Sequence, residues 1–144
     1  MFKLLNKIRD KMKRKIAMTD LDETVKYDLS TRLDGTPRHN KLCHGDFNPT
    51  NIIITDKGEK YIIDWAHVTQ GNASADAART YLIFKLHKKD QIAEQYLELF
   101  CKKSGISKQN VQLWMPIVAA SQLAKGKPEE KEFLESWVDV VDYQ

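Results

Sequence analysis

Three polar side chains in the middle of the sequence have the types and the spacing to bind a metal ion and to move a proton. Asp46 and Asn51 lie five residues apart, and Asp64 follows the apolar run Tyr61-Ile62-Ile63. Carboxylate and amide oxygens suit Mg²⁺, which takes one or two carboxylates together with phosphate oxygens. A further carboxylate beside such a centre can orient a hydroxyl group and accept its proton. The sequence therefore contains one candidate proton acceptor and two candidate metal ligands.

A β-hairpin is the element that must position these residues. The run Ile52-Ile53-Ile54-Thr55 is rich in β-branched residues, which strands favour, and 56–58 (Asp-Lys-Gly) is typical of a turn. Residues 61–63 form the second expected strand. Antiparallel pairing of 51–55 with 60–64 places Asp64 beside Asn51, at the end of a rigid scaffold where functional residues are common.

The order of these residues resembles a known pattern. His44, Asp46 and Asn51 form H-x-D-x4-N, which is similar to the protein-kinase catalytic loop H-R-D-x4-N that precedes the metal-binding Asp of D-F-G. Residues 44–52 and 62–65, followed by 71–80, resemble the aminoglycoside phosphotransferase/choline kinase family, which has a protein-kinase-like fold. The resemblance covers about residues 41–136. Two positions depart from its commonest pattern: Asn48 stands where His is frequent, and Ala66 stands where an acid is frequent.

The resemblance implies a role for each residue. Asp46 would be the catalytic base on the acceptor hydroxyl, and His44 would brace the catalytic loop beside it. Asn51 and Asp64 would bind the nucleotide through Mg²⁺ bridging the phosphates of ATP, while Asp76 would fix the following helix against the loop. We therefore expect an ATP-dependent phosphotransferase, a small-molecule kinase that transfers the γ-phosphate to a substrate hydroxyl. Aminoglycosides, choline-like amines, sugars and amino alcohols all remain open as acceptors.

The pattern of the whole sequence predicts an α+β fold that is mostly helical, with a short β-hairpin carrying the catalytic and metal-binding loops. After Trp65 the chain is expected to be helical, with a loop at Gly71-Asn72. In terms of the resembling family this is a kinase-like C-terminal lobe, residues 41–144, preceded by an N-terminal helical segment, residues 1–40, in one domain overall. Helix starts are expected at Thr19 or Asp20, Ser74, Asp90, Ser107 and Pro128, with a kink at Pro116 and an inward face that includes Ile92.

The N-terminal lobe of the resembling enzymes is not recognisable in this sequence. That lobe supplies a Gly-rich loop over the phosphates and a Lys that pairs with them, whereas the 43 residues before His44 predict two helices. We expect the lobe to be absent, and ATP affinity and turnover of the chain alone to be low. A half-cleft would expose apolar surface and favour self-association or pairing with a separate first lobe. The alternative is a non-catalytic kinase-like remnant that binds a ligand or a protein.

Charge and composition limit the partners. The 144 residues carry a formal charge of +3, too little to demand nucleic acid, and the apolar runs are too short for a membrane span. Residues 1–15 carry seven basic side chains and one acid, on a helix whose apolar stripe is Leu4, Ile8, Met12 and Ile16. This pattern fits a membrane-surface or partner helix, but an outer helix that docks by its stripe is favoured.

Other groups have simpler interpretations. Cys43 and Cys101 are 58 residues apart and form no metal-type pair, which favours free thiols in a cytoplasmic protein. A metal hydrolase using His44, Asp46, Asp64 and His67 is a minor alternative, because no pair of histidines has helical ligand spacing. The acids of the last expected helix favour a solvated face over a site for a cationic sugar; they are Glu129, Glu130, Glu132, Glu135, Asp139 and Asp142.

Overall fold

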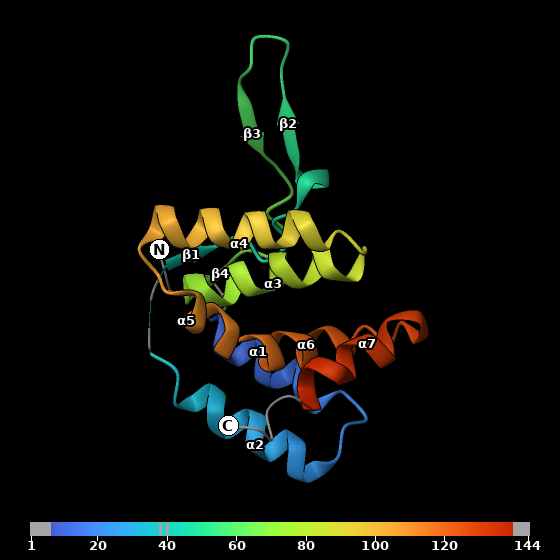
Figure 1. Cartoon of the computed structure of the whole chain (residues 1–144). Helices are drawn as coiled ribbons and strands as arrows, with labels where there is room; N and C mark the ends of the chain where they lie inside the picture. The colour runs from blue at the N-terminus through green and yellow to red at the C-terminus, as the bar shows by residue number, and fades with distance from the viewer. Residues whose placement is uncertain (1–6, 38, 40, 140–144) are drawn as a thin grey trace.

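The computed structural model describes residues 7–37, 39 and 41–139 (Figure 1). Most of these residues are helical, and the strands are short and antiparallel, as the sequence predicts. The elements are α1 Ile8–Ala17, α2 Glu23–Asp34, β1 Lys41–Cys43, the 3₁₀ helix η2 Pro49–Asn51, β2 Ile52–Ile54, β3 Lys60–Ile62, β4 Thr69–Gly71, α3 Ala73–Leu86, α4 Asp90–Ser104, α5 Lys108–Leu113, α6 Met115–Leu123 and α7 Pro128–Asp139.

Helix α6 is the centre of the helical body. Every residue from Met115 to Gln122 is buried, because α1, α3 and α7 all pack around this helix. Figure 1 shows α3 and α4 as an upper layer, with α6, α7 and α1 beneath them and α2 below. A helix that is apolar on all sides is stable only when it is covered in this way. The same core includes residues from α1 to α7, so the N-terminal helices and the later helices share one hydrophobic core.

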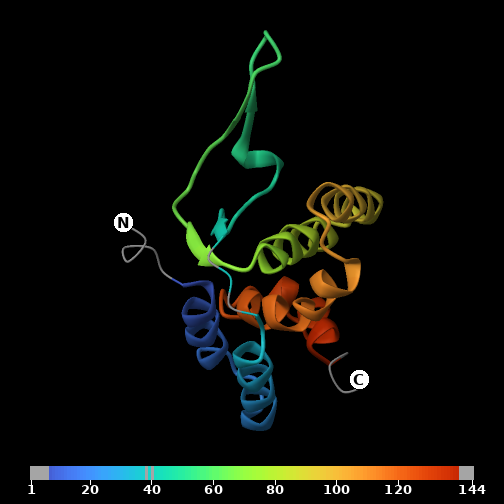
Figure 2. The same ribbon diagram turned by 90° about the vertical axis from the view of Figure 1, so that its left-hand side faces the viewer.

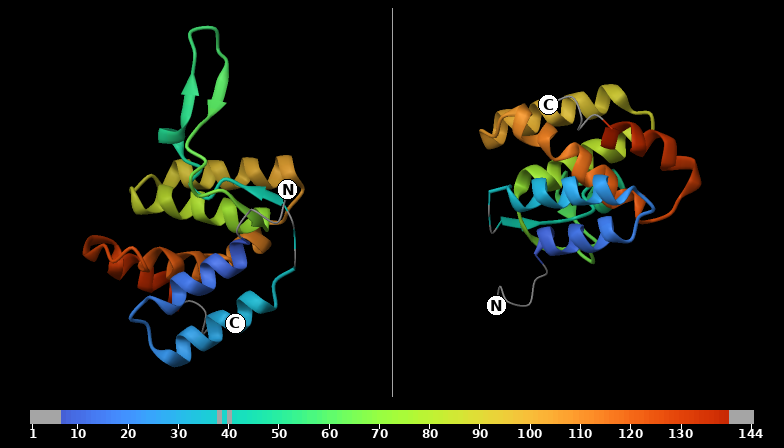
Figure 3. Two further views of the ribbon diagram at one scale, coloured as in Figure 1. Left: turned by 180° about the vertical axis from the view of Figure 1, so that it is seen from behind. Right: turned by 90° about the horizontal axis from the view of Figure 1, so that it is seen from below.

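The basic N-terminal helix docks by its apolar stripe. Ile8, Met12 and Ile16 of α1 are all buried, and α1 packs against α6 and α2 (Figure 3). This confirms that the helix docks on the protein by its apolar stripe, so the stripe residues of α1 are not available to a membrane surface. The first residue of the predicted stripe, Leu4, lies outside the described residues. Among the helices that the structure describes, none combines the length and apolar character that a membrane crossing requires.

Several helix starts differ from those predicted. Helix α2 begins at Glu23, and neither expected cap is used: the Thr19 hydroxyl donates to the Ile16 carbonyl and Asp20 pairs with Lys131. Helix α3 is capped by Asn72, whose side chain accepts from the Ser74 N–H, so the cap lies two residues before the predicted one. Helix starts at Asp90, Ser107 and Pro128 are confirmed.

Two further differences concern the later helices. The expected kink at Pro116 is a break between α5 and α6 at Trp114, with Pro116 in the first turn of α6, where its missing N–H costs no helical hydrogen bond. Ile92, expected to face inward, is 45% exposed, because the buried side of α4 is formed by Ala93 and Leu97.

The predicted hairpin is present and projects from the helices (Figure 2). Strands β2 and β3 pair antiparallel, with Ile52 opposite Ile62 and Ile54 opposite Lys60. This register differs by one residue from the predicted pairing of 51–55 with 60–64, so Asn51 faces Ile63 and not Asp64. A second ribbon at its base pairs β1 with β4, with Cys43 opposite Thr69. Strand β4 contradicts the expectation of helix and loop after Trp65; three-residue strands pair through tertiary context and leave little pattern in the sequence.

Candidate active site

The catalytic-loop candidate, residues 44–47, is held by α3 on one side and by the hairpin on the other. The carboxylate of Asp76 accepts from the backbone N–H groups of His44 and Gly45, at 2.9 Å each. The Thr80 hydroxyl donates to the Phe47 carbonyl oxygen at 2.8 Å. The expected bond between the helix and the loop is therefore present at Asp76, and Thr80 adds a second anchor one turn further along α3.

His44 uses both ring nitrogens in structural hydrogen bonds. Its Nδ1 accepts from the Asp46 N–H at 3.1 Å, which leaves Nε2 as the protonated nitrogen that donates to the Ile63 carbonyl oxygen at 2.8 Å. The ring also packs on Trp65, with centroids 4.6 Å apart. These contacts fit a bracing role and leave neither nitrogen for proton transfer or metal binding. The metal-hydrolase alternative also lacks a site, since the described residues contain no group of three potential His, Cys, Asp or Glu ligands.

The carboxylate of Asp46 lies at the centre of a polar network. Arg79 Nη1 is 3.1 Å from Oδ1, Asn48 Nδ2 donates to the same oxygen, and Asn51 Nδ2 donates to Oδ2 at 3.2 Å. Partial burial acts to raise the pKa of Asp46, but the charge of Arg79 and the hydrogen bonds from Asn51 and Arg79 outweigh it, so the pKa lies below its ordinary value. The Asp46 carboxylate is therefore ionised at neutral pH and held in one orientation by its neighbours.

Asn51 and Asp64 stand at facing ends of the hairpin strands. Asn51 is buried and its amide nitrogen donates to Asp46, so its side-chain oxygen is the atom that a cation would take. The Ile63 N–H donates to the Asn51 carbonyl at 2.9 Å, and Asp64 follows directly. Asp64 has a left-handed backbone, with φ of 58°, and an exposed side chain. A non-glycine residue held in this region is strained, and such residues cluster at functional sites.

Arg79 is the residue of this network that sequence reasoning missed. It lies in the stretch 75–80, which contributes to the family resemblance, but only Asp76 received a role there. Neither the spacing nor the periodicity of the sequence predicts that Arg79 on α3 contacts Asp46, which lies 33 residues earlier in the chain. The signal available in the sequence was a cation in the small-residue first half of this helix, and such a residue is usually on a solvated face.

Gly45 occupies a position that excludes a side chain. Its φ is 86°, and a Cβ there would overlap the carbonyl oxygen of His67. We expect Gly45→Ala to destabilise the fold by about 2–4 kcal/mol, because backbone strain and steric overlap add. The control is Gly58→Ala in the hairpin turn, where φ is 80° and nothing lies within 4 Å, so only about 1 kcal/mol should be lost. Urea unfolding measures both; equal losses would contradict the close approach at Gly45.

The pair of Asp46 and Arg79 predicts a pH-dependent stability term. Because the pKa of Asp46 is lowered on folding, the pair stabilises above the unfolded pKa near 4, and its contribution is lost as the pH falls through the folded value. Arg79→Met should cost about 1–3 kcal/mol of unfolding free energy at pH 7, and this cost should shrink as the pH falls below the unfolded pKa near 4.

The control for this experiment is Lys108→Met, which removes an exposed ion pair to Glu94 and should cost under about 1 kcal/mol. Urea unfolding at a series of pH values measures both variants. A loss in Arg79→Met that is the same at pH 3 and pH 7 would show that Arg79 contributes by packing alone.

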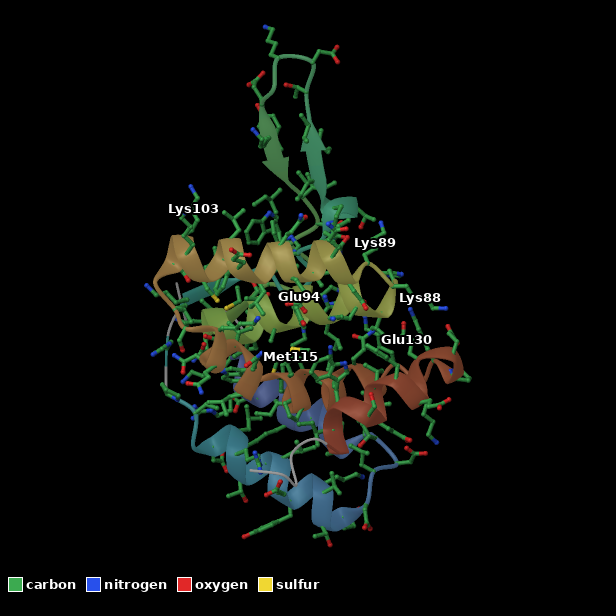
Figure 4. All side chains as sticks on the ribbon, in the orientation of Figure 1. Lys88, Lys89, Glu94, Lys103, Met115 and Glu130 are labelled. Carbon is green, nitrogen blue, oxygen red and sulfur yellow. The ribbon has the colours of Figure 1, made fainter. Side chains whose placement is uncertain are left out.

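The two cysteines and the described acids of the last helix have no role in this network. Cys43 and Cys101 are free thiols, and burial, with the nearby charge of Asp76, raises the pKa of Cys43 to about 12. On α7, Glu130 (labelled in Figure 4) is partly buried, accepts from Gln122 and pairs with Lys127, and Glu135 pairs with Lys131. Glu129 and Glu132 are exposed, which fits a solvated helix face. Asp142 lies outside the described residues.

The fold and the site together define the class of this protein: a helical body with a short hairpin and an H-x-D-x4-N loop is kinase-like. The chain belongs to the phosphotransferase enzyme family, whose model matches residues 5–114. The family resemblance is thereby confirmed, and the match also extends into α1 and α2, which sequence reasoning had left outside it. No curated protein matches the sequence.

Two solved structures share the fold. Choline kinase LicA from Streptococcus pneumoniae matches with a TM-score of 0.71 at 16% identity, over 96% of this chain and 57% of that chain. LicA in complex with AMP matches with a TM-score of 0.61 at 18% identity, over 88% of this chain and 48% of that chain. The chain thus spans about half the length of these proteins.

Proposed function

We propose that this chain carries the catalytic residues of an ATP-dependent phosphotransferase that acts on a small-molecule hydroxyl. The observation that carries the proposal is the contact between the Asn51 and Asp46 side chains, together with the backbone hydrogen bond that joins the segment before Asp64 to Asn51. Asn51 donates to the Asp46 carboxylate, and the residue before Asp64 donates to the Asn51 carbonyl. Family membership supports a phosphotransferase, and the AMP complex of LicA supports nucleotide binding by this fold.

Asp46 is the proposed base. In the transfer step the acceptor oxygen bonds to the γ-phosphorus while the bond from that phosphorus to the β–γ bridging oxygen breaks, and ADP leaves with the electron pair. The hydroxyl proton moves to the Asp46 carboxylate. Arg79 and Asn51 hold this carboxylate still, so little reorganisation accompanies the step.

Asn51 and Asp64 fit a magnesium site. They offer one amide oxygen and one exposed carboxylate, a set that matches an ion which keeps several waters and takes its other ligands from phosphates. When bound, Mg²⁺ neutralises charge on the phosphates during transfer. The left-handed backbone at Asp64 and the hydrogen bond from the Ile63 N–H to the Asn51 carbonyl oxygen limit the directions from which the Asp64 carboxylate could reach the proposed ion.

The remaining half of the nucleotide site is proposed to come from elsewhere. The chain spans 57% of LicA, and the hairpin exposes apolar side chains, among them Ile54 at 65%, Tyr61 at 51% and Ile62 at 44%. Solvent-exposed residues of this kind in a group favour contact with another apolar surface. We infer low ATP affinity for these 144 residues alone, and association of the hairpin with a first lobe or with a second copy.

One observation favours the non-catalytic alternative. Arg79 is ion-paired with Asp46 and lowers its pKa, which makes the carboxylate a weaker base. A kinase-like module that only binds ligand would tolerate this pair without loss. The two functions differ in whether Asp46 matters for transfer or only for folding.

The test of the proposed function is a nucleotide titration. Adding ATP to the ¹⁵N-labelled chain should shift the backbone amide signals of Asn51 and Asp64 when Mg²⁺ is present, and much less in EDTA. ATP should be added at millimolar concentration, because we propose that this chain provides only part of the nucleotide site and binds ATP weakly. The absence of magnesium-dependent shifts at both residues would refute the metal site, and shifts without transfer to any hydroxyl compound would favour the binding module.

A further inference from the structure

A small cavity lies directly behind the catalytic-loop candidate. It measures about 40 Å³, enough for two or three water molecules, and it lies between α1, α3, α6 and the loop. Gly45, which precedes the proposed base, forms part of its wall. The polar side chains around it are Lys11, Lys15, His67, Thr69, Asp76, Arg79, Ser121 and Gln122.

The cavity has an excess of positive charge. Lys11 and Lys15 come from α1 and Arg79 from α3, whereas Asp76 is the one acid in the lining and both its oxygens accept from loop N–H groups. Arg79 is paired with Asp46, just outside the lining, so the excess comes from the two lysines. Among the described residues, neither Lys11 nor Lys15 has a carboxylate within 4.0 Å. Lys11 reaches only the His67 carbonyl, at 3.5 Å. A partly buried cation without a counter-ion is costly, so an anion bound at this wall would be stabilised by both lysines.

Charges outside the lining strengthen this excess. Desolvation, followed by the charges of Lys11, Arg79 and Lys125, lowers the pKa of Lys15 to about 8. Lys125, just beyond α6, also lowers the pKa of Lys11, behind burial and the charges of Arg79 and Arg14, while the negative charge of Asp46 acts in the opposite direction and is outweighed. The nearest α7 acid, Glu130, accepts from Gln122 and faces Lys127 as well.

A hydroxyl donor is also available at the cavity wall. Thr69 is 2% exposed, and its Oγ1 is the buried side-chain polar atom without a hydrogen-bond partner in the described part of the chain. Buried hydroxyl groups are nearly always hydrogen-bonded in native proteins. An oxyanion in the cavity would meet cationic donors from α1 and α3 and a hydroxyl group from β4.

We propose that this cavity binds an anionic group, a carboxylate or a phosphate, on the acceptor whose hydroxyl faces Asp46. The inference rests on the proposed function, since it names the acceptor class for the same site. Arg79 connects the two parts: it lines the cavity and its Nη1 is 3.1 Å from Asp46 Oδ1. A cationic acceptor such as choline would face like charges from Lys11 and Lys15, which costs affinity.

The experiment compares two small hydroxyl compounds of opposite charge. Glycolate and ethanolamine each carry a hydroxyl on a two-carbon unit, and inorganic phosphate serves as an anion without a carbon-bound hydroxyl. In NMR titrations of the 144-residue chain, glycolate and phosphate should shift the Gly45 and Thr69 amides, and ethanolamine should not. Lys15→Gln and Lys11→Gln should each weaken anion binding about tenfold.

Matched variants separate charge from folding. Lys13→Gln removes the same charge from the same helix, but its side chain pairs with Asp34 and is not in the cavity, so anion binding should be unchanged. Lys15→Arg keeps a cation and should retain binding. Anion binding that is equal in Lys15→Gln and in the parent would overturn the proposal, as would ethanolamine binding in preference to glycolate.

The remaining outcomes separate this inference from the proposed function. Phosphate binding without glycolate binding would support an anion site but refute its use by an acceptor. Lysine-dependent binding of glycolate in a chain without magnesium-dependent ATP shifts would support the anion site and refute the phosphotransferase. Magnesium-dependent ATP shifts at Asn51 and Asp64 without any anion binding at Gly45 would support the phosphotransferase and refute the anion site.

Discussion

Replacing Asp46 with asparagine should lower the rate of phosphoryl transfer by about 10²–10⁴-fold, the usual contribution of a positioned general base. The amide has the size of the carboxylate and keeps one oxygen, which can accept from Arg79 or from Asn51 but not from both, and it cannot accept the hydroxyl proton. Magnesium-dependent ATP binding should stay within about threefold of the parent, because Asp46 is not a proposed metal ligand. Transfer of ³²P from ATP to a hydroxyl compound measures the rate.

Asp20→Asn is the matched control for this variant. Asp20 precedes α2, where it pairs with Lys131 on the surface, so the same chemical change should leave transfer unaffected. Transfer at the parental rate by Asp46→Asn would remove the base from the mechanism. A parent chain that binds ATP with magnesium but transfers nothing, under the same conditions, would favour the binding-module alternative instead.

The hairpin and its three functional candidates were accessible from the sequence because their placement is mainly local. A run of β-branched residues, a turn and a second apolar run specify an antiparallel pair without any knowledge of the helices. The register is one residue from the predicted one, so that Ile63 stands opposite Asn51 and Asp64 follows it, because the exact register depends on the turn geometry. The loop from His44 to Asn51 is likewise short enough for its spacing to limit its geometry.

The positions of Arg79, Lys11 and Lys15 were not accessible, because they depend on how α1 and α3 pack around α6. Lys11 approaches His67, 56 residues away, and Arg79 approaches Asp46, 33 residues away. The short pair β1–β4 was missed for the same reason, since three residues per strand carry almost no periodicity. Local capping was also imprecise: Asn72 and Ser74 are both good caps by type, and tertiary packing decides between them.

Helix α1 illustrates how burial changes the meaning of a charge pattern. The sequence shows a basic amphipathic helix, a pattern that membranes and nucleic acids can bind. In the fold its apolar residues Ile8, Met12 and Ile16 are in the core. Two lysines on a neighbouring face, Lys11 and Lys15, then line a cavity next to the proposed base. These two lysines therefore give part of the positive charge of α1 a local role in the proposed anion site.

Replacing Asp64 with asparagine should weaken magnesium-dependent ATP binding by at least about 10–100-fold, since even residues that only support a metal ligand commonly cost that much. Asparagine is the informative substitution because it tolerates the left-handed backbone nearly as well as aspartate. The fold and the hairpin register should survive, and the change should report the lost negative charge alone. Isothermal titration with ATP, with Mg²⁺ and with EDTA, measures it.

The discriminating observation is the magnesium dependence rather than the affinity itself. If Asp64 binds the ion, the variant should bind ATP in Mg²⁺ about as weakly as the parent binds it in EDTA, because both lack the same bridge between carboxylate and phosphate. Asp56→Asn, in the turn of the same hairpin, removes a carboxylate of equal charge and should keep the full magnesium effect. An Asp64→Asn chain that retains that effect would assign the ion to other ligands and leave Asp64 as a residue that shapes the backbone.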